Sequence, residues 1–432
     1  MTPMTAVRSA RQQRVPPWLA GTGMIAVAMG VMNVTTYGFT ILAARLLGPA
    51  QYGALAAVMG LLLVVNVVSL GLQATGARRV SAAPADTATI EAEVMAASYR
   101  SALALGVLCL AATPLVSALL NLHSWATAAL VAATAVPLTV MGGQSGILQG
   151  ERRWGPLAWI YLCVGLGRIG FGAVTLLLWS NALGAMVGVT VGAVLPAVVG
   201  WLALRHPSRT AGRAPGPAAG PVVSWTRGRW ARGGVLRETA HNSHALLAFF
   251  ALSNADVLIA RHVLPEHQAG LYAGGLILTK AVLFLPQFVV VIAFPSMSKS
   301  PTDRRMHLAS LGAVAAIGTV TIGGVAVLSR IAVEFVGGQQ YLPIQSLLWV
   351  FASLGTLLAM VQLLVYNVVA RQHQRAVYVI WAALLALLGA ASLVGSVTVL
   401  VTAVVCVDAA LFAVLLWISL RPAVASLRPA ES

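Results

Sequence analysis

The sequence has few charged residues, few acidic residues and almost no cysteine. Asp, Glu, Lys and Arg together make up 9% of the 432 residues, against roughly 25% in a typical soluble domain. This scarcity excludes an ordinary water-soluble fold, because too little of the chain could face water. The three cysteines lie inside apolar stretches without a Cys-x-x-Cys pair, so the sequence predicts neither a disulfide framework nor a metal site. They are Cys109, Cys163 and Cys406.

Hydrophobic residues make up 59% of the chain and gather in long runs. A helix needs about 20 mostly apolar residues to cross the hydrocarbon of a bilayer. On that rule the sequence predicts an all-α polytopic membrane protein with about twelve transmembrane helices. The last two share one apolar run, which we divide at Gly395-Ser396. The predicted spans are 22–44, 53–75, 101–120, 125–147, 157–179, 183–204, 244–263, 270–296, 308–329, 343–369, 376–394 and 397–420.

The basic residues outnumber the acidic ones by 27 to 11, a net charge of +16. Such a balance is also typical of nucleic-acid binding, but its placement argues against that function. If the N-terminus is cytoplasmic, 22 of the 27 fall in inner segments and three (Arg45, Arg261, Arg330) in outer ones. Positive charge concentrated on the cytoplasmic side is the positive-inside pattern of membrane insertion. We therefore expect both termini in the cytoplasm and no nucleic-acid partner.

One long polar segment interrupts the apolar runs. It contains RTAGRAPGPAAGP and then WTRGRWARGG, a composition typical of a flexible linker or of a segment on the inner membrane surface. It divides the chain into a six-helix lobe at 1–204, a basic Pro/Gly-rich cytoplasmic linker at 205–240 and a second six-helix lobe at 241–432. Six is even, so both lobes enter the membrane in the same direction. We therefore expect a pseudo-two-fold axis along the membrane normal.

A short motif occurs once in each lobe. The first copy reads ILAARLLGPAQYG (41–53) and the second VLIARHVLPEHQAG (257–270). Both place an arginine after an apolar run, a proline four residues later and then Gln-x-Gly. The two arginines, Arg45 and Arg261, are predicted at the outer end of the first helix of each lobe, where proline and glycine shape the turn into the second. The repetition indicates a duplicated unit.

Four charged residues fall within predicted spans, where a charge costs at least ~2.5–3.5 kcal/mol and is a candidate for function. Arg168 and Lys280 are predicted near mid-depth, one in each lobe. Asp256 and Asp408 are the two acidic residues among them. We expect Asp256 and Lys280 to lie at similar depths on neighbouring helices and to form an ion pair, either structural or opening during transport. Arg168 could instead be satisfied by carbonyl groups or by Asp408.

Two amides, Asn33 and Gln144, are weaker candidates for the lining of a cavity, since amides within spans usually bond to neighbouring helices. The sequence indicates no catalytic residue and no metal ligands. Outer connections are short and carry two acidic residues, Glu266 and Glu334. A membrane enzyme that must hold a glycan acceptor outside is therefore disfavoured.

Several stretches together resemble Wzx-type oligosaccharide flippases, the polysaccharide biosynthesis branch of the multidrug/oligosaccharidyl-lipid/polysaccharide (MOP) superfamily. The resemblance begins with LAARLLGPAQYG and continues along most of the chain. Its other pieces are GLQATGARR, GILQGERRWGPLA, NADVLIARHVLPEHQAGLYAGG, FPSMSK and VEFVGGQQYLPIQSLLWV.

The resemblance implies a two-lobed bundle with a central cavity lined by cationic side chains. Its expected activity is to move a polyprenyl-diphosphate-linked oligosaccharide from the inner to the outer leaflet of the bacterial cell membrane. It implies no cofactor. The expected partners are that lipid-linked substrate, membrane lipids and the glycosyltransferases or polymerase of the same pathway. The alternative is a cation-coupled exporter of drugs or other small molecules, of MATE or major facilitator type. MATE coupling would depend on Asp256 or Asp408. The usual major facilitator signature is missing, because Gly76 to Pro84 reads GARRVSAAP.

Overall fold

The computed structural model describes residues 17–205, 234–297, 304–370 and 374–420, and within these ranges the chain forms helices and no strand. The N-terminal half contains seven α-helices and one 3-10 turn. They are α1 (Pro17–Val65), α2 (Val67–Ala82), η1 (Pro84–Asp86), α3 (Thr87–Ala111), α4 (Thr113–Leu119), α5 (Trp125–Gly150), α6 (Trp154–Leu178) and α7 (Ala182–Arg205). The C-terminal half contains α8 (Val235–Val263), α9 (Glu266–Met297), α10 (Arg304–Val327), α11 (Ser329–Val336), η2 (Gln339–Leu347), α12 (Leu348–Ala370), α13 (Gln374–Ala390), η3 (Ala391–Leu393) and α14 (Val397–Leu420).

These helices account for the twelve predicted spans. Nine described stretches are long and apolar enough to cross a membrane, and the first of them, Gly23–Ala82, covers two crossings. The apolar helix α9 and the shorter apolar stretch Val377–Leu393 supply the other two. The division of the last apolar run is confirmed, since η3 ends at Leu393 and α14 begins at Val397.

The first two spans are joined by a sharp bend inside α1. Gly48 has a φ of 71° and a ψ of 169°, which is not helical. A positive φ is easily adopted by glycine, and Pro49 then occupies the first position of the next helix, where its missing N–H is harmless. The bend therefore forms the turn predicted between 44 and 53.

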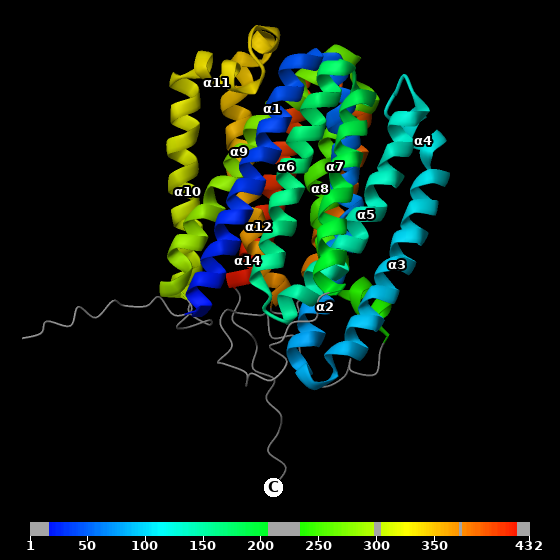
Figure 1. The fold of residues 1–432 in the computed structure, drawn as a ribbon. Helices are drawn as coiled ribbons and strands as arrows, with labels where there is room; N and C mark the ends of the chain where they lie inside the picture. The colour runs from blue at the N-terminus through cyan, green and yellow to red at the C-terminus, as the bar shows by residue number, and fades with distance from the viewer. Residues whose placement is uncertain (1–16, 206–233, 298–303, 371–373, 421–432) are drawn as a thin grey trace, which may run out of the picture.

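The second and third spans extend further on the inner side than predicted. The expected limits were 53–75 and 101–120, but α2 continues to Ala82 and α3 begins at Thr87, with η1 between them. This polar hairpin projects at the lower end of the molecule in Figure 1. Hydropathy marks where a helix leaves the hydrocarbon, whereas backbone hydrogen bonding continues into water, which explains the difference.

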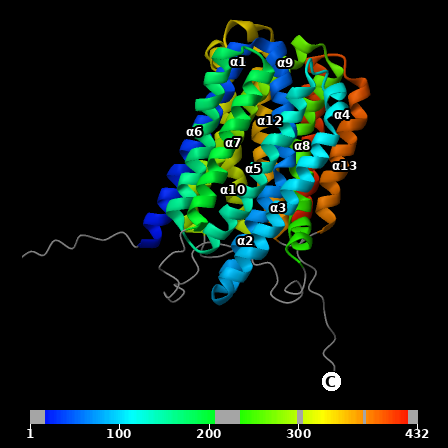
Figure 2. The same ribbon diagram turned by 45° about the vertical axis from the view of Figure 1, so that its right-hand side comes forward.

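Most helix contacts lie within one half of the chain. In the first half α6 packs on α1 and α7, and α5 on α2, α3 and α7. In the second half α12 packs on α9, α10 and α14, and α13 on α8 and α14. The two lobes meet chiefly where α1 contacts α8 and α9 and where α2 contacts α8. Figures 1 and 2 show the resulting bundle of roughly parallel and antiparallel helices.

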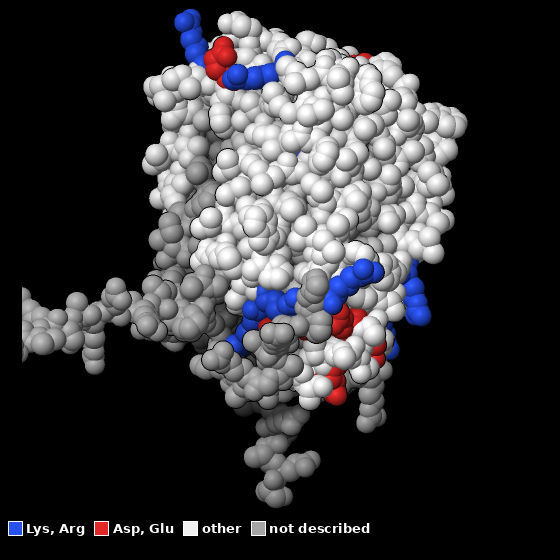
Figure 3. Space-filling view, viewed as in Figure 1, with Lys and Arg blue, Asp and Glu red and all other residues white. Residues whose placement is uncertain are grey.

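The surface of the bundle agrees with a membrane-spanning protein. Figure 3 shows coloured charged side chains at the two ends of the molecule and an uncharged band between them. Large apolar side chains are exposed on the helices, among them Leu103, Leu177 and Val320, which are 69%, 73% and 77% exposed. Such exposure is costly in water and favourable in lipid.

The linker residues 206–233 lie outside the described residues, so the boundary between the lobes stays a prediction.

We predict that the linker faces the cytoplasm and the α8–α9 turn faces outward. Cysteines introduced singly at Ser208 and Glu266, in a variant lacking the three native cysteines, should react differently with a membrane-impermeant thiol reagent added to intact cells. Glu266→Cys should be labelled and Ser208→Cys protected. Labelling of Ser208→Cys from outside would contradict the orientation derived from the basic residues.

Candidate functional site: charged residues within the membrane

Arg168 lies near mid-membrane and points into the N-terminal lobe. It is ten residues from the outer end of α6, or about 15 Å along the helix axis. A Cβ added at Gly165 would overlap α1, and one added at Gly167 would contact α7. Leu166, in contrast, is 50% exposed on the outer surface of the bundle. The helical repeat places Arg168 between the faces that contact α1 and α7, so it projects into the lobe rather than toward lipid.

The Arg168 side chain lies deep within the protein but is only partly buried. No residue that the structure describes forms a hydrogen bond or an ion pair with its guanidinium. A charge in this position is costly unless water or an anionic group satisfies it. Arg168 is therefore free to bind an anion within the lobe, and the alternative of a pair with Asp408 is not formed.

Lys280 is the corresponding cation of the C-terminal lobe. It lies 14 residues from the outer end of α9, or about 21 Å along the helix axis. The preceding residues fix the helix: the Tyr37 hydroxyl of α1 donates to the Ile277 carbonyl, and the Thr279 hydroxyl donates to the Phe351 carbonyl at 2.8 Å. Lys280 is only partly buried, and its ammonium forms no hydrogen bond or ion pair with the described residues.

Asp256 is held by a tyrosine and not by the expected lysine. Its carboxylate is 3% exposed and accepts hydrogen bonds from the Tyr272 hydroxyl at 3.0 Å and from the Val257 N–H at 2.8 Å. Lys280 lies close enough for an electrostatic interaction with Asp256, but within the described part of the chain the two form no ion pair at 4.0 Å or less. The expected ion pair is therefore not formed in this structure.

Helix geometry explains that difference. Asp256 is seven residues from the outer end of α8, and Tyr272 is six residues from the outer end of α9. Lys280, 14 residues along the same helix, lies about 10 Å deeper than Asp256. The short turn between α8 and α9 thus brings Tyr272 to the depth of Asp256. Tyr272 was missed because a tyrosine in an apolar run carries no signal of its own.

Asp408 is the second acidic residue of the C-terminal lobe. It is 2% exposed in α14, 11 residues from that helix's outer end, or about 17 Å. It interacts electrostatically with Asp256 and Tyr272. The three residues bring α8, α9 and α14 into one polar cluster, which we call the acidic cluster.

The two candidate amides occupy different settings. Asn33 in α1 is partly buried and forms no hydrogen bond to the described residues. Gln144 in α5 is 1% exposed, and its amide packs against the position of Gly200 in α7. Its Oε1 has no hydrogen-bond donor among the described residues. Gln144 therefore fills a helix contact, whereas Asn33 keeps accessible surface.

A buried ion-pair cluster on the inner side was not predicted. Glu238 of α8 is 6% exposed and pairs with both Arg78 and Arg79 of α2, the Arg79 Nε donating at 3.0 Å. Next to Glu238 in α8, the Thr239 hydroxyl donates to the hydroxyl of Thr75 at 3.3 Å, and Thr75 lies about one turn before Arg78 and Arg79 in α2. The cluster joins the lobes at the inner end of the α2–α8 contact. The sequence could not pair residues that lie 159 positions apart.

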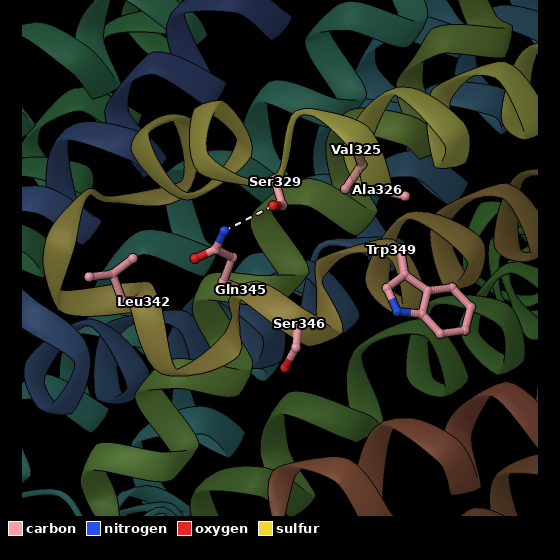
Figure 4. A pocket seen from close by; sticks show the side chains of 7 residues that line it. All are labelled: Val325, Ala326, Ser329, Leu342, Gln345, Ser346 and Trp349. Atoms are coloured by element: carbon pink, nitrogen blue, oxygen red, sulfur yellow. Dashed lines mark hydrogen bonds between the residues drawn. The ribbon is translucent and has the colours of Figure 1, made fainter.

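A groove with a volume of about 440 Å³ opens at the outer edge of the C-terminal lobe. It lies between the end of α10, the start of α11, η2 and the start of α12, and Figure 4 shows its side chains. The Gln345 amide donates to the Ser329 hydroxyl at 2.9 Å across it. The groove contains no charged side chain and lies apart from Arg168 and Lys280. Its lining residues are Val325, Ala326, Ser329, Leu342, Gln345, Ser346 and Trp349.

The described residues include no group of three or more His, Cys, Asp or Glu side chains that could hold a metal ion. The Asp256–Tyr272–Asp408 arrangement offers two carboxylates and a hydroxyl, which can exchange a proton or attract a cation. The two cations in the lobe interiors can attract an anion. The geometry therefore suits the binding and movement of charged groups across the membrane.

Solved structures of similar fold include transporters. An inward-facing multidrug resistance MATE family transporter of the MOP superfamily is 12% identical, with a TM-score of 0.65 over 92% of this chain and 97% of that one. An outward-facing multidrug resistance MATE family transporter is 12% identical, with a TM-score of 0.56 over 93% of this chain and 95% of that one. A MOP superfamily transporter from Pyrococcus furiosus is 13% identical, with a TM-score of 0.51 over 93% of this chain and 95% of that one.

No curated protein matches the sequence. The sequence profile of polysaccharide biosynthesis proteins matches residues 18–301, which include all six predicted spans of the N-terminal lobe and the first two of the second. The apolar helices are those of a multi-pass membrane protein, and the fold is that of the MATE family transporters named above. The chain belongs to the polysaccharide biosynthesis protein family.

Proposed function

We propose that this transporter moves a polyprenyl-diphosphate-linked oligosaccharide from the inner to the outer leaflet of the bacterial cytoplasmic membrane. The observation that carries the proposal is the pair of unpaired cations, Arg168 in one lobe and Lys280 in the other, both near mid-depth among the described residues. The family match supports a role in polysaccharide biosynthesis. Neighbouring glycosyltransferases and a polymerase would supply and use the substrate.

A diphosphate fits these two side chains. It carries about two negative charges, and its oxygens match the planar fork of a guanidinium. Arg168 inside the N-terminal lobe and Lys280 on α9 would each attract the diphosphate as it crosses, while the lipid tail stays in the hydrocarbon. Moving these negative charges outward is favoured by about 2.3 kcal/mol per charge per 100 mV of inside-negative potential. Membrane potential would therefore help to drive export.

Ligand-induced stabilisation tests the substrate class. A polyprenyl diphosphate added to the purified protein at about 100 times its dissociation constant should stabilise the fold by roughly 2.7 kcal/mol. The rise in melting temperature should be smaller with a polyprenyl monophosphate and absent with a neutral polyprenol. Lys280→Gln should reduce the diphosphate effect, because it removes one of the two cations. Equal shifts for the diphosphate and the neutral polyprenol would contradict the proposal.

The acidic cluster favours a second candidate function, cation-coupled export of small molecules. Asp256 and Asp408 are both buried and interact with each other, so loss or gain of a cation would change their repulsion. In that case Asp256→Asn and Asp408→Asn should each abolish ion-dependent drug efflux from vesicles. If neither variant alters efflux while both still export glycan, the flippase is favoured.

A further inference from the structure

The two copies of the repeated motif meet at the outer end of the molecule. A Cβ added at Gly53, which ends the first copy, would lie 2.9 Å from the Cα of Gly270, which ends the second. A Cβ added at Gly270 would overlap the Pro49 carbonyl. Only glycine leaves room for so close an approach of two backbones. The Gln-x-Gly part of the motif therefore allows the lobes to touch.

The arginine of the second copy reaches into the first lobe. Arg261 is 2% exposed, and its guanidinium donates to the carbonyls of Leu120 and Asn121, both at 2.9 Å. It also pairs with Glu266 of its own lobe at 3.0 Å. Leu120 and Asn121 directly follow α4, so Arg261 caps the C-terminal end of that helix. Carbonyls at a helix C-terminus lack intrahelical donors and attract positive charge.

The arginine of the first copy makes the reciprocal contact. Arg45 donates to the Glu334 carbonyl at 2.6 Å, near the C-terminal end of α11. The Gln340 amide donates back to the Arg45 carbonyl at 3.0 Å, and the Tyr341 hydroxyl to the Ala44 carbonyl at 3.3 Å. Arg45 is exposed, unlike Arg261.

These contacts are related by the duplication. α4 ends the third span of the first lobe, and α11 follows the third span of the second. Each arginine thus caps the helix at the outer end of the other lobe's third span. We propose that Arg45, Arg261 and the Gly53–Gly270 contact form the outer gate of the transporter, closed in this structure. The proposal rests on the transporter fold and not on the identity of the cargo.

The interlobe contacts of Arg45 and Arg261, which we call the two latches, differ in strength. The buried guanidinium of Arg261 would lose two hydrogen bonds when the outer ends separate, those to the carbonyls of Leu120 and Asn121. Arg45 would lose one hydrogen bond, to the Glu334 carbonyl, and that bond is exposed to water. Hydrogen bonds that involve a charged group are stronger when buried. Opening of the outer side is therefore limited chiefly by Arg261.

Distance measurement between spin labels tests the latches. Labels at Trp125→Cys in the N-terminal lobe and Val327→Cys in the C-terminal lobe occupy exposed outer positions, 66% and 82% exposed. Arg261→Lys should raise the open, long-distance population about tenfold, since each lost charged hydrogen bond is worth roughly that factor. Arg45→Ala should raise it about two- to threefold, in keeping with an exposed contact. Gly270→Leu should raise it most, by forcing the backbones apart.

Unchanged distances in Arg45→Ala and Arg261→Lys, both conservative enough to fold, would overturn the latch assignment. This readout needs no substrate, so it stays informative even if the proposed cargo is wrong.

Cross-linking tests the gate without altering either arginine. The His262 Nδ1 of α8 lies 2.9 Å from the Leu119 carbonyl of α4, and both side chains are exposed. A short bifunctional thiol reagent joining Leu119→Cys to His262→Cys should stop export in a variant without native cysteines. The matched control joins Ser329→Cys to Gln345→Cys, whose native side chains lie 2.9 Å apart within one lobe, and should export normally. Undiminished export after complete cross-linking of the first pair would overturn the gate.

Discussion

Arg168→Ala is expected to abolish glycan export while the protein still reaches the membrane. The change removes an unpaired cation near mid-depth, so no described partner is left with an unsatisfied charge. Folding should be unaffected or slightly improved, because burial of a charge in a bilayer is costly. The diphosphate, in contrast, would lose its bidentate partner in the N-terminal lobe.

Arg168→Lys should retain a small part of the export, since it keeps the charge but loses the guanidinium fork. The measurement is complementation of a flippase-deficient strain, with the membrane level of each variant determined in parallel. Arg330→Ala is the matched control, because it removes an exposed arginine at the outer surface and should leave export intact. Full export by Arg168→Ala at a normal membrane level would contradict the two-cation mechanism.

Glu238→Ala is expected to destabilise the protein by about 3–5 kcal/mol, the usual cost of removing one partner of a buried ion pair. The variant leaves the guanidinium groups of Arg78 and Arg79 facing one another without the carboxylate that joins them. It also releases the inner end of α8 from α2. Thermal unfolding of the purified protein in detergent should show a clearly lower midpoint.

The chain provides an internal control for this prediction. Glu93 pairs with the same Arg79, at 3.1 Å, but is 54% exposed. Glu93→Ala should cost no more than about 1 kcal/mol, because water screens an exposed pair. Comparable losses in Glu238→Ala and Glu93→Ala would mean that burial of Glu238 contributes little to the contact between the lobes.

Much of the fold followed from hydropathy. The number of crossings and the division at Gly395-Ser396 were predicted correctly, because the cost of placing polar residues in hydrocarbon acts on each segment separately. The limits of the second and third spans were too short on the inner side, where helices α2 and α3 continue beyond the membrane. The turn between the first two spans was predicted from its proline and glycine, and the bend at Gly48 lies there.

The charged residues within the spans could be named from the sequence, but their contacts could not. Arg168, Lys280, Asp256 and Asp408 were identified because charge within a span is costly wherever it occurs. The partner of Asp256 was predicted wrongly, because Lys280 is a charged residue and Tyr272 is not, whereas depth along α9 selects Tyr272. Glu238 carries no such signal in the sequence, since it lies outside the spans.

The sequence by itself determined the membrane environment, the helical class, the duplication and the side chains that carry charge into the bilayer. These depend on transfer from water to lipid, a property of each segment alone. Only the tertiary structure decided which groups meet: Asp256 with Tyr272, Glu238 with Arg78 and Arg79, and each repeated arginine with the opposite lobe. The physical reason is that hydrogen bonds and ion pairs act over a few ångströms, and only the packing of helices far apart in the sequence sets those distances.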